Sequence, residues 1–332
     1  MSFFINKNCD GTANMPYTPY VKPYKTPTDI IADLKLKQLS FIDETAAEKI
    51  LKQINYYHFK IYLHPLLDPN CPTKKNYKAG EYFEDAIDLY RFDEQIRFVL
   101  FKAIARIEIK LRSRLDHIMS SFSNNPFWYL DNQWFRINNN NSYVIDSIRN
   151  RISNEFSNTK EEYATHYKSK YYNNTHDNYK FLPPFWIASE FLSIGTISKI
   201  YDNINVISIN QSPGSPLDSM AAEFGASSFK TLCSWIKTLR DIRNRRAHHS
   251  RLWNANLRAP LNIIPLLNIA PLNSNRIYCS LVMVHKILVT LDIQDINLFD
   301  ELTLLIGKYF CVRNYLGSAG FPTNWHTDPF WT

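Results

Sequence analysis

The spacing of apolar residues along the chain predicts α-helices throughout. Apolar side chains recur at intervals of three and four residues, and no segment shows the strict alternation of a β-strand. The chain is therefore predicted to be all-α, with roughly ten helices. The longest pattern runs from about Tyr82 to Met119, and its apolar side chains are Leu89, Phe92, Ile96, Val99, Leu100, Ala103, Ile104, Ile107, Leu111, Leu115 and Ile118.

The opposite face of this long helix is rich in charge. Such a face is typical of a solvated helix surface. Arg106 and Glu108 border the apolar stripe, so two interpretations stay open for them, contact with a substrate or an ion pair between helices. The whole face carries Arg91, Arg97, Lys102, Arg106, Glu108, Lys110, Arg112 and Arg114.

Helix-start signals place shorter helices on both sides of the long one. Thr26-Pro27-Thr28-Asp29 has the residues of a capping box, and Asp43 can cap the next helix. The aromatic run at 55–62 is interpreted as core packing with an aromatic rim. Further helices are expected at 144–156, 160–171, 183–201 with a break at Gly195, 275–291 and 298–310, with loops at 65–80 and 204–216 and an aromatic clasp at 321–331.

One predicted helix leads into an unusual basic stretch. Ser227 or Ser228 can cap it, and its apolar stripe is Leu232, Trp235, Ile236, Leu239 and Ile242. The stretch from Leu239 to Trp253 then contains five arginines, two adjacent histidines and a single acid, Asp241.

Arg243, Asn244 and His248 in this stretch suit a phosphodiester. Arginine binds phosphate oxygens and stays charged, while histidine titrates near neutral pH. Asn244 and His248 share a helix face, whereas Arg243 and His248 lie about 140° apart on a straight helix and would grip a phosphate from different sides. His249 is adjacent to His248 and projects elsewhere.

Metal-independent RNA cleavage needs a proton acceptor, a proton donor and stabilisation of the charge that develops on phosphorus. One arginine and one histidine do not readily fill all three roles. The remainder would come from a second copy of the chain or from another part of this one. The alternative interpretation is a basic helix end that binds RNA, or an acidic partner, without catalysis.

Composition agrees with an ordered protein, and its basic balance favours a polyanionic partner, with an ordinary basic enzyme as the alternative. The chain has 332 residues, of which 45% are hydrophobic and 21% charged, and its net charge is +7. The dinucleotide pattern G-x-G-x-x-G and the P-loop pattern G-x-x-x-x-G-K do not occur. No cofactor is expected.

Cysteine usage and hydropathy point to the cytoplasm. The five cysteines lie far apart, with no C-x-x-C, so neither a disulfide framework nor a zinc site is expected, and no metal is assigned. No signal peptide and no membrane span are expected.

The basic stretch resembles a known ribonuclease motif. Arg243-Asn-Arg-Arg-Ala-His248 is similar to the R-x(4–6)-H motif of HEPN-superfamily ribonucleases, and the continuation His249-Ser-Arg-Leu-Trp-Asn254 resembles a block of AbiD/AbiF-type abortive-infection proteins. Other segments resemble the same family in the same order, from about residue 25 to 331. They are Asn55-Tyr-Tyr, Arg106-Ile-Glu-Ile-Lys-Leu-Arg112, Pro183-Pro-Phe-Trp186 with Gly195, and Gly320-Phe-Pro-Thr-Asn-Trp325.

The resemblance implies a fold and a function. The fold would be a HEPN-type helical bundle with additional helices and an aromatic-rich inserted region. The function would be phage defence by RNA damage after infection, with an active site made by pairing two HEPN units. Because this chain has one such motif, the resemblance implies a homodimer. It also implies a small structured regulatory RNA as a partner.

On this basis the residues receive roles in a metal-independent endoribonuclease. Arg243, Asn244 and His248 are the expected catalytic residues, and Glu108 is expected to support them. The competing hypotheses are a non-catalytic protein that scaffolds a small structured RNA, and a helical regulator that binds nucleotides or proteins. RNA contacts are expected from Arg106, Arg240, Arg246, Arg251 and His249.

The expected organisation is an extended N-terminal arm and one compact helical unit. The arm covers 1–24 and the unit covers 25–332. Within the unit, N-terminal helices are expected at 25–119, inserted central helices at 120–200, and C-terminal helices with the R-x4-H motif at 217–332.

Overall fold

The computed structural model describes residues 20–73, 75–136, 142–247 and 250–331, without the side chains of 142, 143, 246 and 247. The all-α prediction is confirmed. The described residues form helices α1 to α13 and 3-10 turns, with isolated β-bridges and no sheet. None of these helices is both long and apolar enough to cross a membrane. Most of the expected N-terminal arm lies outside the described residues.

The chain divides into two compact units, residues 1–84 and 85–332. The boundary lies near the start of the longest helix, whereas the sequence predicts one compact unit over 25–332. Each unit is described by itself.

The first unit contains three short helices, α1 (Pro27–Leu36), α2 (Glu44–Gln53) and α3 (Tyr56–Leu63). Both predicted N-terminal caps are confirmed. Thr26 and Asp29 form a complete capping box, and the Asp43 side chain accepts the amide of Ala46 at 3.0 Å. The aromatic run of α3 combines core and rim as predicted, because Phe59 is buried whereas Tyr57 is 87% exposed.

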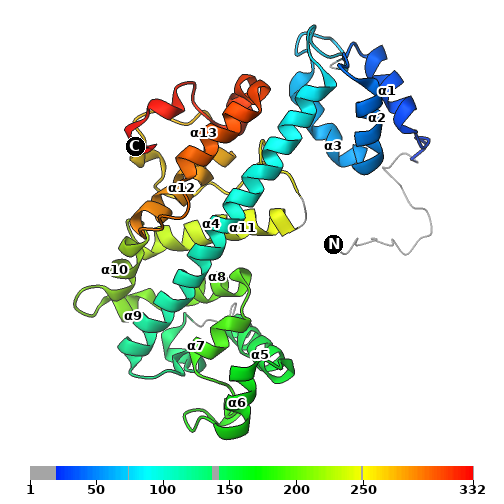
Figure 1. The fold of residues 1–332 in the computed structure, drawn as a ribbon. Coiled ribbons are helices and arrows are strands. Elements are labelled where there is room, and N and C mark those ends of the chain that lie inside the picture. Colours follow the sequence, from blue (N-terminus) through cyan, green and yellow to red (C-terminus); the bar gives the residue numbers. More distant parts are fainter. Residues whose placement is uncertain (1–19, 74, 137–141, 248–249, 332) are drawn as a thin grey trace, which may run out of the picture. The chain divides into compact units, whose positions relative to one another are not determined.

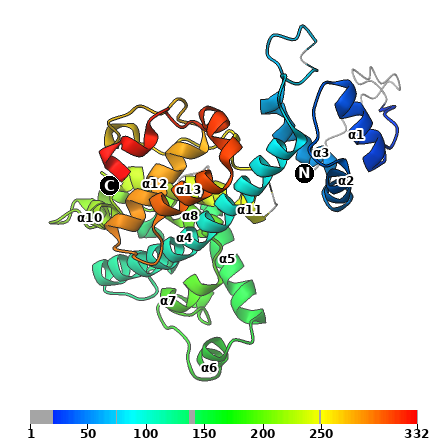
Figure 2. The same cartoon turned by 45° about the horizontal axis from the view of Figure 1, so that its top comes forward.

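The second unit is built on α4 (Phe83–Ser123), which runs 41 residues and continues out of the first unit. Helices α5 to α7 lie on one side of α4, and α12 and α13 lie on the other (Figure 1 and Figure 2). The remaining bounds are α5 Ser142–Asn158, α6 Glu162–Lys170, α7 Phe185–Ala188, α8 Ile194–Asn203, α9 Val206–Asn210, α10 Pro216–Glu223, α11 Phe229–Ala247, α12 Ile277–Thr290 and α13 Leu298–Lys308.

The apolar stripe of α4 faces the core as predicted, and polar contacts fix the helix to its neighbours. Tyr201 on α8 donates its hydroxyl to the carbonyl of Leu111 at 2.8 Å, and Arg114 pairs with Glu223 on α10. One prediction for the charged face is wrong. Arg97 is only 6% exposed, because it pairs with the buried Asp93.

Two loop predictions in the second unit are also wrong. Gly195 does not break a helix but lies inside α8, and the chain turns at Ser193, whose hydroxyl accepts the amide of Thr196 at 3.3 Å. Part of the segment predicted as a flexible loop at 204–216 forms α9. Asn205 accepts the amide of Ser208 there, so an asparagine that resembled a loop residue acts as a helix cap.

The C-terminal segment closes over α12 as an aromatic clasp, as predicted. Phe321, Trp325 and Trp331 are buried, and the ring of Phe321 lies 4.7 Å from that of Tyr278. The ring of His285 on α12 lies tilted against that of Trp331, with the ring centres 4.8 Å apart.

Burial of His285 predicts a loss of stability in mild acid. Burial, aided by the charge of Lys286, lowers the pKa of His285 below its ordinary value of about 6.5. As pH falls through about 6.5 the unfolded chain takes up this proton first, so stability present above that pH is lost below it. We expect less than about 1 kcal/mol, because solvent partly screens the ring.

Thermal unfolding at about pH 7.5 and about pH 5.5 measures this effect. The fall in melting temperature should be smaller in His285→Gln than in the unsubstituted protein. Equal falls in the two proteins would contradict the assignment.

Candidate functional site

Helix α11 carries the basic motif at its C-terminal end. Its start is capped as predicted, because the Ser228 hydroxyl accepts the amide of Thr231 at 3.2 Å. Helices α8, α10 and α12 pack against α11 (Figure 1). The core therefore fixes the helix axis and the position of its last turn. The predicted stripe is buried throughout, at Leu232, Trp235, Ile236, Leu239 and Ile242.

The structure brings three of the predicted site residues to the last turns of α11. Arg240 and Arg243 are half-buried, and Asn244 is exposed. His248, His249 and the side chain of Arg246 lie outside the described residues. The roles assigned to those three residues stay predictions.

Arg240 and Arg243 differ from the neighbouring Arg245 in having no partner among the described residues. Within the described part of the chain, neither guanidinium donates a hydrogen bond or joins an ion pair. Arg245 instead bonds Asp241 at 3.3 Å and the carbonyl of Asn256 at 3.0 Å. Arg245 therefore holds the loop after the motif, whereas the described residues leave Arg240 and Arg243 available to a ligand.

The segment after the two histidines is fixed to α4 through a buried ion pair. Asp93 is 0% exposed and accepts the amides of Leu252 at 3.0 Å and Trp253 at 2.7 Å. Its other oxygen accepts from Arg97 at 3.0 Å, and Arg97 also donates to the carbonyl of Ser250 at 3.4 Å. A carboxylate that accepts two amides and a guanidinium has its lone pairs well satisfied in a buried site.

A backbone hydrogen bond also holds the C-terminal end of α11. The carbonyl of Arg245 accepts the amide of Ser250 at 2.8 Å, which joins the two sides of residues 246–249. Both flanks of the histidine pair are therefore held, one by α11 and the other by α4. Leu252 and Trp253 are buried, and the Trp253 ring packs edge-on to Phe92 at 6.4 Å.

Asp93 and Arg97 were not predicted as functional residues. They stand four residues apart, with Leu89 four positions before Asp93 in the apolar stripe. An acid and an arginine four residues apart can pair on a helix, and here they border the apolar stripe. That spacing is the one signal in the sequence that could have indicated a buried ion pair.

Comparison with family models decides the classification. The model described as "Abi-like protein" matches residues 49–254, which is more than half of the chain. The chain belongs to the Abi-like protein family. A search of curated proteins and a search of solved structures return no significant match.

The Abi-like family suggests a role in abortive infection, which is a form of phage defence. The matched region ends at Asn254, the last residue of the block after the motif. It also includes Asp93, Arg97 and α11. The ion pair of Asp93 with Arg97, and also Arg240 and Arg243, therefore lie within the matched region.

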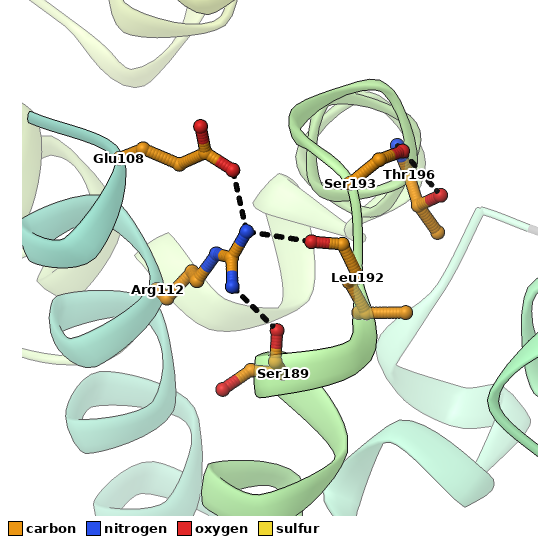
Figure 3. Close-up of polar contacts among 6 residues, drawn as sticks. All are labelled: Glu108, Arg112, Ser189, Leu192, Ser193 and Thr196. Atoms are coloured by element: carbon orange, nitrogen blue, oxygen red, sulfur yellow. Dashed lines mark hydrogen bonds and ion pairs between the residues drawn. The ribbon is translucent and has the colours of Figure 1, made fainter. Parts of the chain in front are cut away.

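The two secondary candidates on α4 of this Abi-like chain both have ion-pair partners. Arg106 is 56% exposed and pairs with Asp295 at 3.1 Å. Glu108 pairs with Arg112 on the next turn of α4 (Figure 3). The roles of Arg106 and Glu108 toward RNA stay predictions.

Arg112 links α4 to the turn that precedes α8. It donates to the carbonyls of Ser189 at 3.0 Å and Leu192 at 2.6 Å, while Glu108 holds the same guanidinium from the other side (Figure 3). The contact positions the start of α8, the helix that packs against α11.

Arg112→Met is expected to destabilise the protein by about 2 kcal/mol, because hydrogen bonds from a charged, half-buried donor are lost. Arg106→Met on the same helix should cost less than about 0.5 kcal/mol, since its ion pair is exposed. Urea unfolding of both variants makes the comparison. Equal destabilisation would show that Arg112 is not a cross-link.

Proposed function

We propose that this Abi-like protein is a metal-independent endoribonuclease of the HEPN type, related to AbiD/AbiF proteins. The observation that carries the proposal is the pair Arg243 and Asn244. Both side chains lack partners among the described residues, at the end of a helix whose following segment is anchored by Asp93. A stable fold leaves a buried or half-buried guanidinium unpaired only at a cost, which ligand binding would offset.

Three groups carry the proposed reaction. Arg243 holds the scissile phosphate and the charge that develops on it, and Asn244 orients His248 or the phosphate. His248 takes the proton of the ribose 2′-hydroxyl as its oxygen attacks phosphorus. The bond from phosphorus to the 5′-oxygen breaks, and that oxygen receives a proton. The products are a 2′,3′-cyclic phosphate and a free 5′-hydroxyl.

The proton donor for the leaving oxygen comes in this proposal from a second copy of the chain. One His248 accepts a proton while another donates one, which requires two motifs at one phosphate. The sequence contains one R-x4-H motif, so a homodimer supplies the second. Arg240, Arg246, Arg251 and His249 contact the RNA backbone on either side.

A comparison of binding with cleavage tests the proposal. His248→Ala should abolish RNA cleavage while RNA affinity stays within about threefold of the unsubstituted protein. Cleavage that persists in this variant would overturn the assignment.

The alternative function is a non-catalytic protein that scaffolds a small structured RNA. It predicts no cleavage by any form of the protein. It also predicts that an Arg243/His248 double variant loses function only in proportion to its lost RNA affinity.

A further inference from the structure

A charged cavity of about 700 Å³ lies on the N-terminal half of α11. Its other walls come from α8, α9, α10, Arg136 and the segment around residue 260. The volume falls within the range of small-molecule sites in proteins. Four cations line the cavity, namely Arg136, Lys230, Lys237 and Arg258, against the two carboxylates of Asp202 and Asp218.

Both carboxylates of the cavity are already engaged. Asp202 pairs with Lys237 at 2.6 Å. Asp218 accepts the amide of Phe229 at 2.7 Å and the side-chain amide of Asn210 at 3.0 Å. By contrast, Lys230 and Arg258 have no side-chain partner among the described residues. The cavity therefore presents a net positive charge, with two cations available to an anion.

The cavity also has an apolar wall. Val206 and Leu261 line it, and Phe229 forms part of the lining with its ring stacked on Tyr201 at 5.6 Å. Burial raises the pKa of the Cys233 thiol in this lining to about 12, so the thiol stays neutral at physiological pH. These features suit reversible binding of a ligand that is part anionic and part flat and apolar.

The cavity and the motif share one face of α11. Lys230, Ser234 and Lys237 follow at helical spacing along the cavity, and Asn244 continues that face two turns later. Lys237 and Asn244 are about 10 Å apart along the helix axis. A nucleic-acid strand bound at Asn244 reaches the cavity within about three nucleotides at a spacing of about 3.4 Å per nucleotide.

We propose that this cavity binds a phosphorylated nucleotide, with its phosphate at Lys230 and Arg258 and its base against Val206 and Leu261. The nucleotide is either free or part of an RNA strand that continues to the motif. Binding of a nucleotide within an RNA strand rests on the proposed function, whereas binding of a free nucleotide does not.

The test measures binding in the full-length protein carrying His248→Ala, which keeps RNA intact. The probes are 5′-AMP and a short single-stranded RNA, titrated by calorimetry and by fluorescence anisotropy. The Lys230→Glu/Arg258→Glu variant reverses two exposed charges of the cavity. Lys308→Glu/Arg313→Glu is the matched control, because it also reverses one exposed lysine and one exposed arginine, and both lie outside the cavity lining.

The cavity variant should weaken binding of at least one probe by about tenfold or more, because two charge-assisted contacts are lost. The control should match the parent. Loss of 5′-AMP binding identifies a free-nucleotide site, whereas a loss confined to RNA identifies a subsite on the strand. For RNA the slope of log affinity against log salt should also flatten by about 1.4, the value for two phosphate contacts.

Unchanged affinity for both probes, or an equal loss in the control, would overturn the proposal. Equal melting temperatures of the cavity variant and its parent exclude misfolding. Binding is measured without cleavage, so failure of the ribonuclease proposal would leave this result interpretable.

Discussion

Arg243→Ala is expected to lower RNA cleavage by about 100- to 1000-fold, the usual cost of removing one group that stabilises transition-state charge. Its stability should change by less than about 0.5 kcal/mol, because the Arg243 guanidinium has no partner within the described residues. Single-turnover cleavage and thermal unfolding of the same preparation measure the two effects. The combination of large activity loss and unchanged stability is the signature of a ligand-binding arginine.

Arg245→Ala is the matched control for this prediction. Arg245 stands two residues further along α11 and bonds Asp241 and the carbonyl of Asn256. We expect it to lose about 1 kcal/mol of stability and to keep most of its cleavage activity. A reversal, with Arg243→Ala unstable but active, would contradict the role given to Arg243.

Asp93→Ala should have the largest effect on stability, a loss of about 3–5 kcal/mol. The substitution leaves the Arg97 guanidinium buried without its carboxylate. It also removes the acceptor of the Leu252 and Trp253 amides, so the segment after the histidines is released from α4. Denaturant unfolding measures the first consequence, and cleavage at a temperature where the variant stays folded measures the second.

A double variant separates the buried charge from the amide contacts. Asp93→Ala/Arg97→Met removes the unpaired charge, yet two buried amides still lack an acceptor, at about 1–3 kcal/mol each. We therefore expect partial recovery of stability without recovery of cleavage. Full recovery of both would mean that Asp93 does not position the motif.

The sequence predicted the helices that face the core because their apolar periodicity is strong. Helix α11 illustrates this, since its stripe and its Ser228 cap both appear as predicted. The buried pair of Asp93 and Arg97 was missed because charged residues on a long helix are normally solvated. The neighbouring sequence does not distinguish a solvated pair from one that a distant loop covers. The partner amides lie about 160 positions away along the chain.

Short helices were missed for a related reason. Residues 206–210 are too short a segment to show a periodic pattern, and the asparagines around them favour loops and helix caps alike. Tertiary contacts decide between these states. The Asn210 side chain, for instance, accepts the amide of Leu217 at 3.0 Å and so joins α9 to α10.

The candidate site was predicted in part. The basic cluster and its position at a helix end follow from the sequence, as does membership of an abortive-infection family. The distinction between free and engaged arginines does not, because it depends on acceptors brought together by the fold. Arg243 and Arg245 are both arginines and stand two residues apart, and only the structure shows that Arg245 is the one held by Asp241 and Asn256.

The end groups of RNA cleaved in excess EDTA test the central claim most directly. RNA incubated with the full-length protein and EDTA should be cut to fragments that carry 2′,3′-cyclic phosphates and 5′-hydroxyls, and His248→Ala should give no such fragments. Fragments with 3′-hydroxyls and 5′-phosphates, or cleavage that stops when EDTA is added, would contradict attack by the 2′-hydroxyl without a metal.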